Sequence, residues 1–87
     1  MNYLIMCKSL TNAQRGALLL ERRGVSAAVV KAPQKLRGSG CGYALSLYRR
    51  PDEAVEILKN NHLLTGKIYR RLENGEYLEV GEHDLSR

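Results

Sequence analysis

The chain has 87 residues, 44% of them hydrophobic and 26% charged, and a formal net charge of +5. These values describe one globular domain with a small core and exclude a disordered chain. No apolar run approaches the ~20 residues of a membrane span, and the N-terminus lacks the pattern of a signal peptide, so we expect a cytoplasmic protein that does not enter a membrane. The two cysteines, Cys7 and Cys41, are then expected to be free thiols.

The beginning of the chain predicts a strand followed by a helix. Tyr3–Cys7 is a short apolar run of the length of a buried strand. Apolar residues at helical intervals follow it, Thr11 and Gln14 have the spacing of a capping box, and Gly24 is placed to end the helix. Gly16 falls on the apolar face of this helix, where a missing side chain predicts close approach to a sheet.

One further helix and several strands are predicted in the remainder of the chain. Pro51 begins the second helix, with acidic residues in its first turn, and Asn60-Asn61 ends it. Asn74-Gly75 predicts a hairpin turn, and residues 32–40 form a loop. Strands are expected at residues 27–31, 43–48, 66–72 and 76–80.

This order of elements, βαββαβ with one added strand, predicts an α+β protein of ferredoxin-like fold, in which one antiparallel sheet carries both helices on one face. We expect one such domain over residues 1–80 and a polar tail over residues 81–87. The first and third strands are then central neighbours that run in opposite directions. Cys7 and Cys41 would therefore meet at one edge of the sheet, together with the N-terminus of the first helix and Lys67.

The segment Arg37-Gly38-Ser39-Gly40-Cys41-Gly42-Tyr43 contains the candidate reactive residue, Cys41. A cysteine between two glycines has no neighbouring side chains to shield its sulfur, and the flexible backbone can turn N–H groups toward an atom that the sulfur holds. A helix N-terminus and nearby cations both favour thiolate over thiol. We expect the bound atom to be surrounded by Ser39, Gly40, Gly42, Arg37, Cys7 and Lys8. The alternative is that the glycines serve only the turn and the cysteine is buried.

Four segments carry a resemblance to a known family: the Tyr3-Leu4-Ile5 strand, the Ser9-Leu10 helix start, the loop from Arg37 to Cys41-Gly42, and the Tyr43-Ala44-Leu45 strand. From Asn2 to Leu72 the chain resembles the small bacterial domains called selenium/sulfur carrier protein-like. The resemblance implies a ferredoxin-like domain whose loop cysteine, here Cys41, holds sulfur or selenium as a persulfide or perselenide. It also implies donor and acceptor proteins as partners. We therefore expect an accessory carrier and not a multiple-turnover enzyme.

Two roles are open for Cys7. It could resolve a persulfide on Cys41 by forming a disulfide, or it could be a small residue of the core. Its place at the end of an apolar strand favours the core.

An RNA-binding module is the alternative from another class, because RNA-recognition motifs share this order of strands and helices. Gly42-Tyr43-Ala44 and Tyr48 fit their aromatic pattern in part. However, Cys41 stands where a basic residue is expected, and Leu45 where a second aromatic residue should stack, so nucleic acid is the less favoured partner. A further alternative is a non-catalytic domain that forms a homodimer by covering a tyrosine-rich sheet face with a second copy.

Neither a metal nor a cofactor is expected. Cys7 and Cys41 are single and not in CxxC pairs, and His83 lies in the polar tail. The glycine-rich segment precedes a strand and not a helix, which excludes a P-loop.

Overall fold

The centre of the fold is an antiparallel pair of apolar strands, β1 (Tyr3–Cys7) and β3 (Tyr43–Leu47). The computed structural model describes residues 2–36, 42–64 and 66–81. In the register of the central pair Cys7 lies opposite Tyr43, so the end of β1 meets the beginning of β3. The predicted arrangement of these two strands is confirmed.

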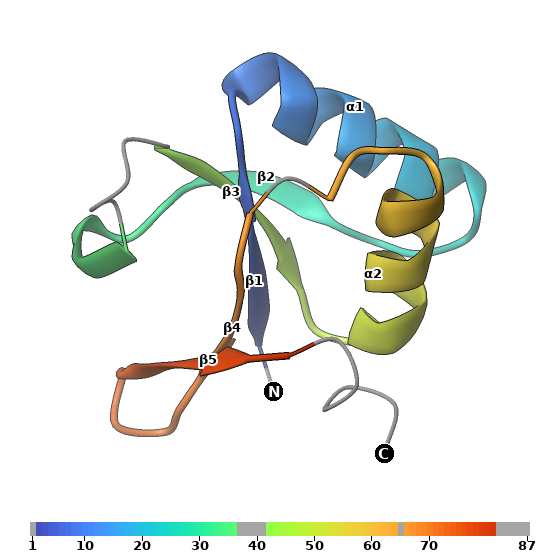
Figure 1. The fold of residues 1–87 in the computed structure, drawn as a ribbon. Helices are drawn as coiled ribbons and strands as arrows, with labels where there is room; N and C mark the ends of the chain where they lie inside the picture. Colours follow the sequence, from blue (N-terminus) through green and yellow to red (C-terminus); the bar gives the residue numbers. More distant parts are fainter. Residues whose placement is uncertain (1, 37–41, 65, 82–87) are drawn as a thin grey trace.

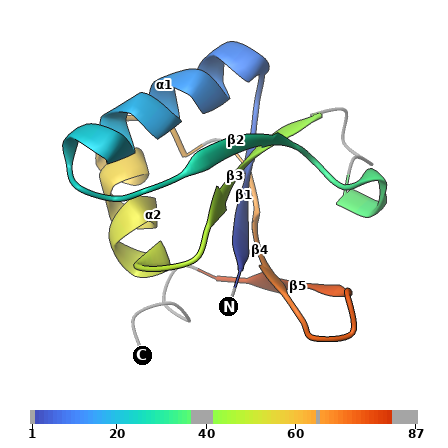
Figure 2. The ribbon, with the colours of Figure 1, turned by 180° about the vertical axis from the view of Figure 1, so that it is seen from behind.

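Shorter strands complete a five-stranded antiparallel sheet in the order β2-β3-β1-β4-β5 (Figure 1). Their bounds are Ala28–Lys31 for β2, Ile68–Arg71 for β4 and Tyr77–Val80 for β5. Gly75 lies in the turn between β4 and β5 with a φ of 85°, in agreement with the predicted hairpin. Both helices cover the same face of the sheet (Figure 2), so the protein has the predicted α+β ferredoxin-like fold with an added C-terminal strand.

The first helix, α1 (Leu10–Arg22), begins at Ser9. The Ser9 Oγ accepts a hydrogen bond of 3.1 Å from the backbone N–H of Asn12. The predicted capping box at Thr11 and Gln14 is therefore wrong, because Ser9 already supplies the capping oxygen where the helical backbone begins.

Gly16 allows α1 to lie close to both the sheet and the second helix. A Cβ atom at this position would stand 3.0 Å from Leu45 Cδ1 in β3 and 3.2 Å from Leu58 Cδ2. Leu58 belongs to α2 (Pro51–Asn60), which begins at the predicted proline. The close approach predicted for Gly16 is confirmed, and Gly24 follows α1 with a φ of 79°, as a residue that ends a helix often does.

The main core lies between the helices and the sheet. Its buried members come from the central strands, both helices, β4 and the turn after α1, and they are Ile5, Cys7, Ala13, Leu20, Val25, Leu45, Leu47, Ala54, Val55, Leu58 and Ile68. Burial of these apolar side chains is the dominant favourable contribution to folding.

The opposite side of the sheet, which we call the open face, is partly covered by a short 3-10 helix, η1 (Gln34–Leu36) (Figures 1 and 2). Leu36 packs there against a second buried cluster. That cluster consists of Leu4, Met6, Ala32 and Ala44. Lys35 Nζ lies 3.3 Å from Glu76 Oε1, beside the β4–β5 hairpin. The described part of the predicted loop therefore folds back over the open face.

Candidate functional site at one edge of the sheet

The candidate site lies where β1 ends and β3 begins, at an edge that we call the cysteine edge and define by Cys7, Lys8 and Gly42. Gly42 directly precedes β3, and its carbonyl oxygen accepts a hydrogen bond of 2.8 Å from the N–H of Ala32. Ala32 directly follows β2. The connection between β2 and β3 is therefore closed at its base, with both ends on the cysteine edge.

The structure brings three of the predicted site residues together, namely Cys7, Lys8 and Gly42. Apart from Gly42 and its neighbours in the chain, the described residues place no atom within 4 Å of the position that a Cβ would occupy at Gly42. The other predicted site residues lie outside the described residues, and these are Arg37, Ser39, Gly40 and Cys41.

Cys7 is a core residue. It is 3% exposed, belongs to the main core, and donates from its Sγ to the carbonyl oxygen of Ile5 at 3.4 Å. The interpretation of Cys7 as a small core residue is confirmed. Burial of this kind shields a thiol from reagents in solution, and structural cysteines are inert for this reason.

The N-terminus of α1 opens at the cysteine edge, because Ser9 follows Cys7 after one intervening residue. The N–H groups of the first turn of a helix carry a partial positive charge. No acidic side chain occupies the first turn of α1 to offset it. A negatively charged group at this edge is therefore stabilised.

Lysines from separate segments add positive charge to the same edge. Lys8 follows β1, Lys31 ends β2, and the carbonyl oxygen of Lys67 accepts a hydrogen bond of 2.9 Å from the N–H of Met6. The prediction that Lys67 lies at this edge is confirmed. Its Nζ is 3.5 Å from Glu79 Oε1, but both side chains are exposed and an ion pair of this kind is weak.

Positions 43 and 45, at which an RNA-recognition motif would carry its stacking aromatic residues, do not lie on the open face. Tyr43 packs on the helix side of the sheet, against the main core. Leu45 is buried in that core as well. On the open face, Tyr69 and Tyr77 pack against the second cluster. The structure therefore gives no support to base stacking on Tyr43.

The sequence did not predict a set of hydrogen bonds from Arg50 to Glu53 and Gly24 at the opposite end of β3, which we call the Arg50 clasp. Arg50 lies between β3 and α2 in the left-handed region, with a φ of 56°. Its guanidinium donates two hydrogen bonds of 2.7 Å to Glu53 and one of 3.0 Å to the carbonyl oxygen of Gly24. The hydrogen bonds to Glu53, and the charge of that carboxylate, raise the pKa of Arg50 above its ordinary value. Pro51 is the signal in the sequence, because proline disfavours the right-handed helical conformation in the residue before it.

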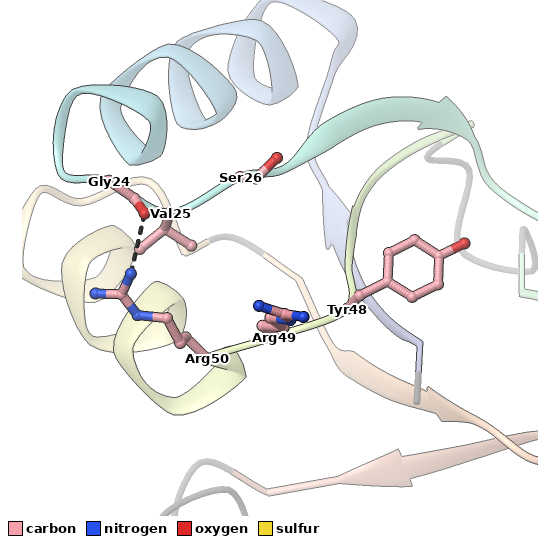
Figure 3. Close-up of a pocket in the computed structure, with 6 residues that line it drawn as sticks. All are labelled: Gly24, Val25, Ser26, Tyr48, Arg49 and Arg50. Atoms are coloured by element: carbon pink, nitrogen blue, oxygen red, sulfur yellow. Dashed lines mark hydrogen bonds between the residues drawn. The ribbon is translucent and has the colours of Figure 1, made fainter.

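A hollow of about 430 Å³ lies beside this clasp (Figure 3). It is lined by Gly24, Val25, Ser26, Tyr48, Arg49 and Arg50. Because these residues follow β3 and precede β2, the hollow lies at the other end of those strands from the cysteine edge.

Metal ligands do not cluster within the described ranges, where no three side chains of His, Cys, Asp and Glu come together in an arrangement that could hold an ion. In the same ranges, neither helix has the length and apolar character needed to span a membrane.

Comparison with known proteins identifies the family. No curated protein and no solved structure matches the chain. The model of the family described as putative Se/S carrier protein-like matches residues 2–70, which run from the residue before β1 to the penultimate residue of β4 and include Cys41. The chain therefore belongs to the putative Se/S carrier protein-like family.

Proposed function

We propose that this protein carries sulfur or selenium, held as a persulfide or perselenide on Cys41, from a donor protein to an acceptor protein. The observation that carries the proposal is the burial of Cys7: the chain has two cysteines, and this one is 3% exposed within the core. The family match includes Cys41 and supports a role in handling selenium or sulfur. A thiol that accepts such an atom must be reachable by a partner, so we assign the role to Cys41.

The transfer step needs neither an oxidant nor a cofactor. The Cys41 thiolate attacks the outer sulfur of a donor persulfide, and a new S–S bond forms as the S–S bond of the donor breaks. The donor leaves as a thiolate with the electron pair of the broken bond, so the step involves no net oxidation or reduction. Selenium moves in the same way when it replaces the outer sulfur. Discharge to the thiolate of an acceptor is the same step in the opposite direction.

The cysteine edge, to which the next residue Gly42 belongs, supports a thiolate at Cys41. Gly42 is the adjacent residue and lies on the cysteine edge, and consecutive Cα atoms are about 3.8 Å apart. The N-terminus of α1 and Lys8 both favour negative charge at this edge. The described residues beyond the chain neighbours of Gly42 leave space beside it, which supports the accommodation of an additional atom.

We assign the remaining contacts to the loop that contains the reactive residue. Arg37 would attract the negative charge of the persulfide, while Ser39 and Gly40 would supply hydrogen-bond donors to it. We further propose that the protein acts as an accessory carrier in the reducing bacterial cytoplasm, where a thiol remains available between rounds of transfer.

The rate of alkylation of Cys41 as a function of pH tests the physical basis of this proposal. The Cys7→Ser variant isolates Cys41, and the rate is followed by mass spectrometry. We expect the rate to reach half its maximum below the unperturbed cysteine pKa of about 8.5. The same titration in 1 M salt should move the midpoint upward, because salt screens the charges at the edge.

Two controls make the result interpretable. The Cys41→Ser variant reports the reaction of Cys7, which we expect to be slow until the protein is unfolded by denaturant. The Lys8→Gln variant should move the midpoint of Cys41 upward without loss of folding. A midpoint at or above about 8.5 for Cys41 in the folded protein would remove the physical basis of the carrier role.

A further inference from the structure

The hollow beside the Arg50 clasp has a composition that suits an anion. Its lining contains two arginines, Arg49 and Arg50, and none of its lining residues is acidic. Figure 3 shows both arginines on the segment that leaves β3, with the guanidinium of Arg50 directed toward the carbonyl oxygen of Gly24. Guanidinium groups bind phosphate and carboxylate oxygens through paired, charge-assisted hydrogen bonds.

Arg49 is available for such a ligand. Its side chain is exposed, and within residues 2–36, 42–64 and 66–81 it makes no hydrogen bond or ion pair. The next residue, Arg50, does have partners, because its guanidinium bonds to Gly24 and to Glu53.

Arg50 forms a fixed wall of the hollow. A guanidinium has five N–H donors, and bonds to Glu53 and Gly24 use three of those of Arg50, which leaves two. Its backbone is held at a φ of 56°, a left-handed conformation that is unfavourable for a non-glycine residue. Residues in such conformations persist only where the surrounding structure holds them, and they cluster at binding and catalytic sites.

Tyr48 places an exposed aromatic side chain at the rim of the hollow. The residue is 70% exposed, although it is a large aromatic residue directly after a buried strand. The volume of about 430 Å³ falls within the usual range of small-molecule sites and is much larger than an inorganic oxyanion requires. A ligand that combines a ring with an oxyanion would use the phenol and the guanidinium groups together.

We propose that the hollow lined by Tyr48, Arg49 and Arg50 binds a nucleoside phosphate, with its phosphate on Arg49 and its base against the Tyr48 ring. This site is independent of sulfur transfer, because it lies at the other end of β3 from the cysteine edge. The hydroxyl of Ser26, which also lines the hollow, can donate a further hydrogen bond to the phosphate or the ribose.

Titration of the isotope-labelled 87-residue chain with adenosine monophosphate, followed by two-dimensional NMR, tests this proposal. We expect the amide signals of residues 24–26 and 48–50 to move, and adenosine monophosphate to bind about tenfold or more tightly than adenosine or inorganic phosphate. The Arg49→Ala variant should weaken binding by about tenfold or more. The Tyr48→Ala variant should weaken it by about fivefold or more.

Matched controls separate a specific site from general attraction to a basic protein. Arg15→Ala removes the same charge from an exposed position on α1 outside the hollow and should leave the affinity unchanged. Cys41→Ser should also leave it unchanged, since the site does not use the thiol.

Several results would overturn the proposal. Equal binding of inorganic phosphate and adenosine monophosphate would exclude a role for the ring, and equal losses in Arg15→Ala and Arg49→Ala would exclude a specific site. Tighter binding of a short oligoglutamate peptide would assign the hollow to an acidic segment of a partner protein.

Discussion

Gly66 lies directly against the backbone of Met6. A Cβ atom at position 66 would stand 2.9 Å from the carbonyl carbon of Met6 and would overlap with its carbonyl oxygen. The N–H of Met6 donates to the carbonyl oxygen of Lys67 at 2.9 Å, so the two segments are also joined by a hydrogen bond. This close contact fixes the entry into β4 beside the cysteine edge.

We therefore expect Gly66→Ala to lower the free energy of unfolding by about 1–3 kcal/mol, because backbone atoms must move to admit the methyl group. Unfolding in urea, followed by circular dichroism, measures the change. Gly42→Ala is the matched control at the same edge, where no described atom is within 4 Å, and it should change the stability by less than about 0.5 kcal/mol. Equal stability of the two variants would show that the contact at Gly66 is not tight.

The attachment of η1 to the open face depends on the apolar packing of Leu36 more than on the ion pair between Lys35 and Glu76. Leu36→Ala should lower the free energy of unfolding by about 1–2 kcal/mol, since it removes a partly buried side chain from the second cluster. Glu76→Gln breaks an exposed ion pair with Lys35 and should cost at most about 0.5 kcal/mol. Urea unfolding of both variants gives the ranking, and a larger loss for Glu76→Gln would contradict this view.

The backbone conformation of Arg50 can be tested by comparing two truncations of the same side chain. Arg50→Ala and Arg50→Gly both lose the hydrogen bonds to Glu53 and Gly24. Only glycine adopts the φ of 56° without strain, so the glycine variant should be the more stable of the two by about 1 kcal/mol. Thermal unfolding provides the comparison. If the alanine variant is equally stable or more stable, the left-handed conformation carries no cost at this position.

We propose that the folded domain ends near residue 80 and that the tail is dispensable. The described helices and strands all end by Val80. A chain that stops after Gly81 should therefore unfold within about 0.5 kcal/mol of the full chain. A loss greater than about 1 kcal/mol in urea unfolding would show that residues 82–87 belong to the folded domain.

Local signals in the sequence predicted most of the elements, because each signal restricts the backbone where it stands. Pro51 begins α2, Gly24 adopts a positive φ after α1, and Asn74-Gly75 occupies the turn before β5. The alternation and length of the apolar runs then predicted the strands, and their order predicted the ferredoxin-like sheet.

Features that depend on contacts between distant residues could not be predicted in this way. The ion pair between Lys35 and Glu76 joins positions 41 residues apart, and the hydrogen bond from Arg50 to Gly24 joins positions 26 apart. The face that Tyr43 occupies follows from its register opposite Cys7, which the sequence of either strand alone does not specify.

The candidate site was predictable in part. The meeting of Cys7, Lys8 and Gly42 at one edge followed from the fold, and the burial of Cys7 followed from its apolar strand. The expectations for residues 37–41 lie outside the described residues and stay predictions.

The most direct test of the carrier role is mass analysis of the Cys7→Ser protein after incubation with glutathione persulfide and removal of the excess reagent. We expect one added sulfur atom, mapped by peptide fragmentation to Cys41, and its loss when a thiolate acceptor is added. The Cys41→Ser protein, treated in the same way, should gain none. A folded Cys7→Ser protein that gains no sulfur, or an equal gain in Cys41→Ser, would contradict the assignment of the carrier role to Cys41.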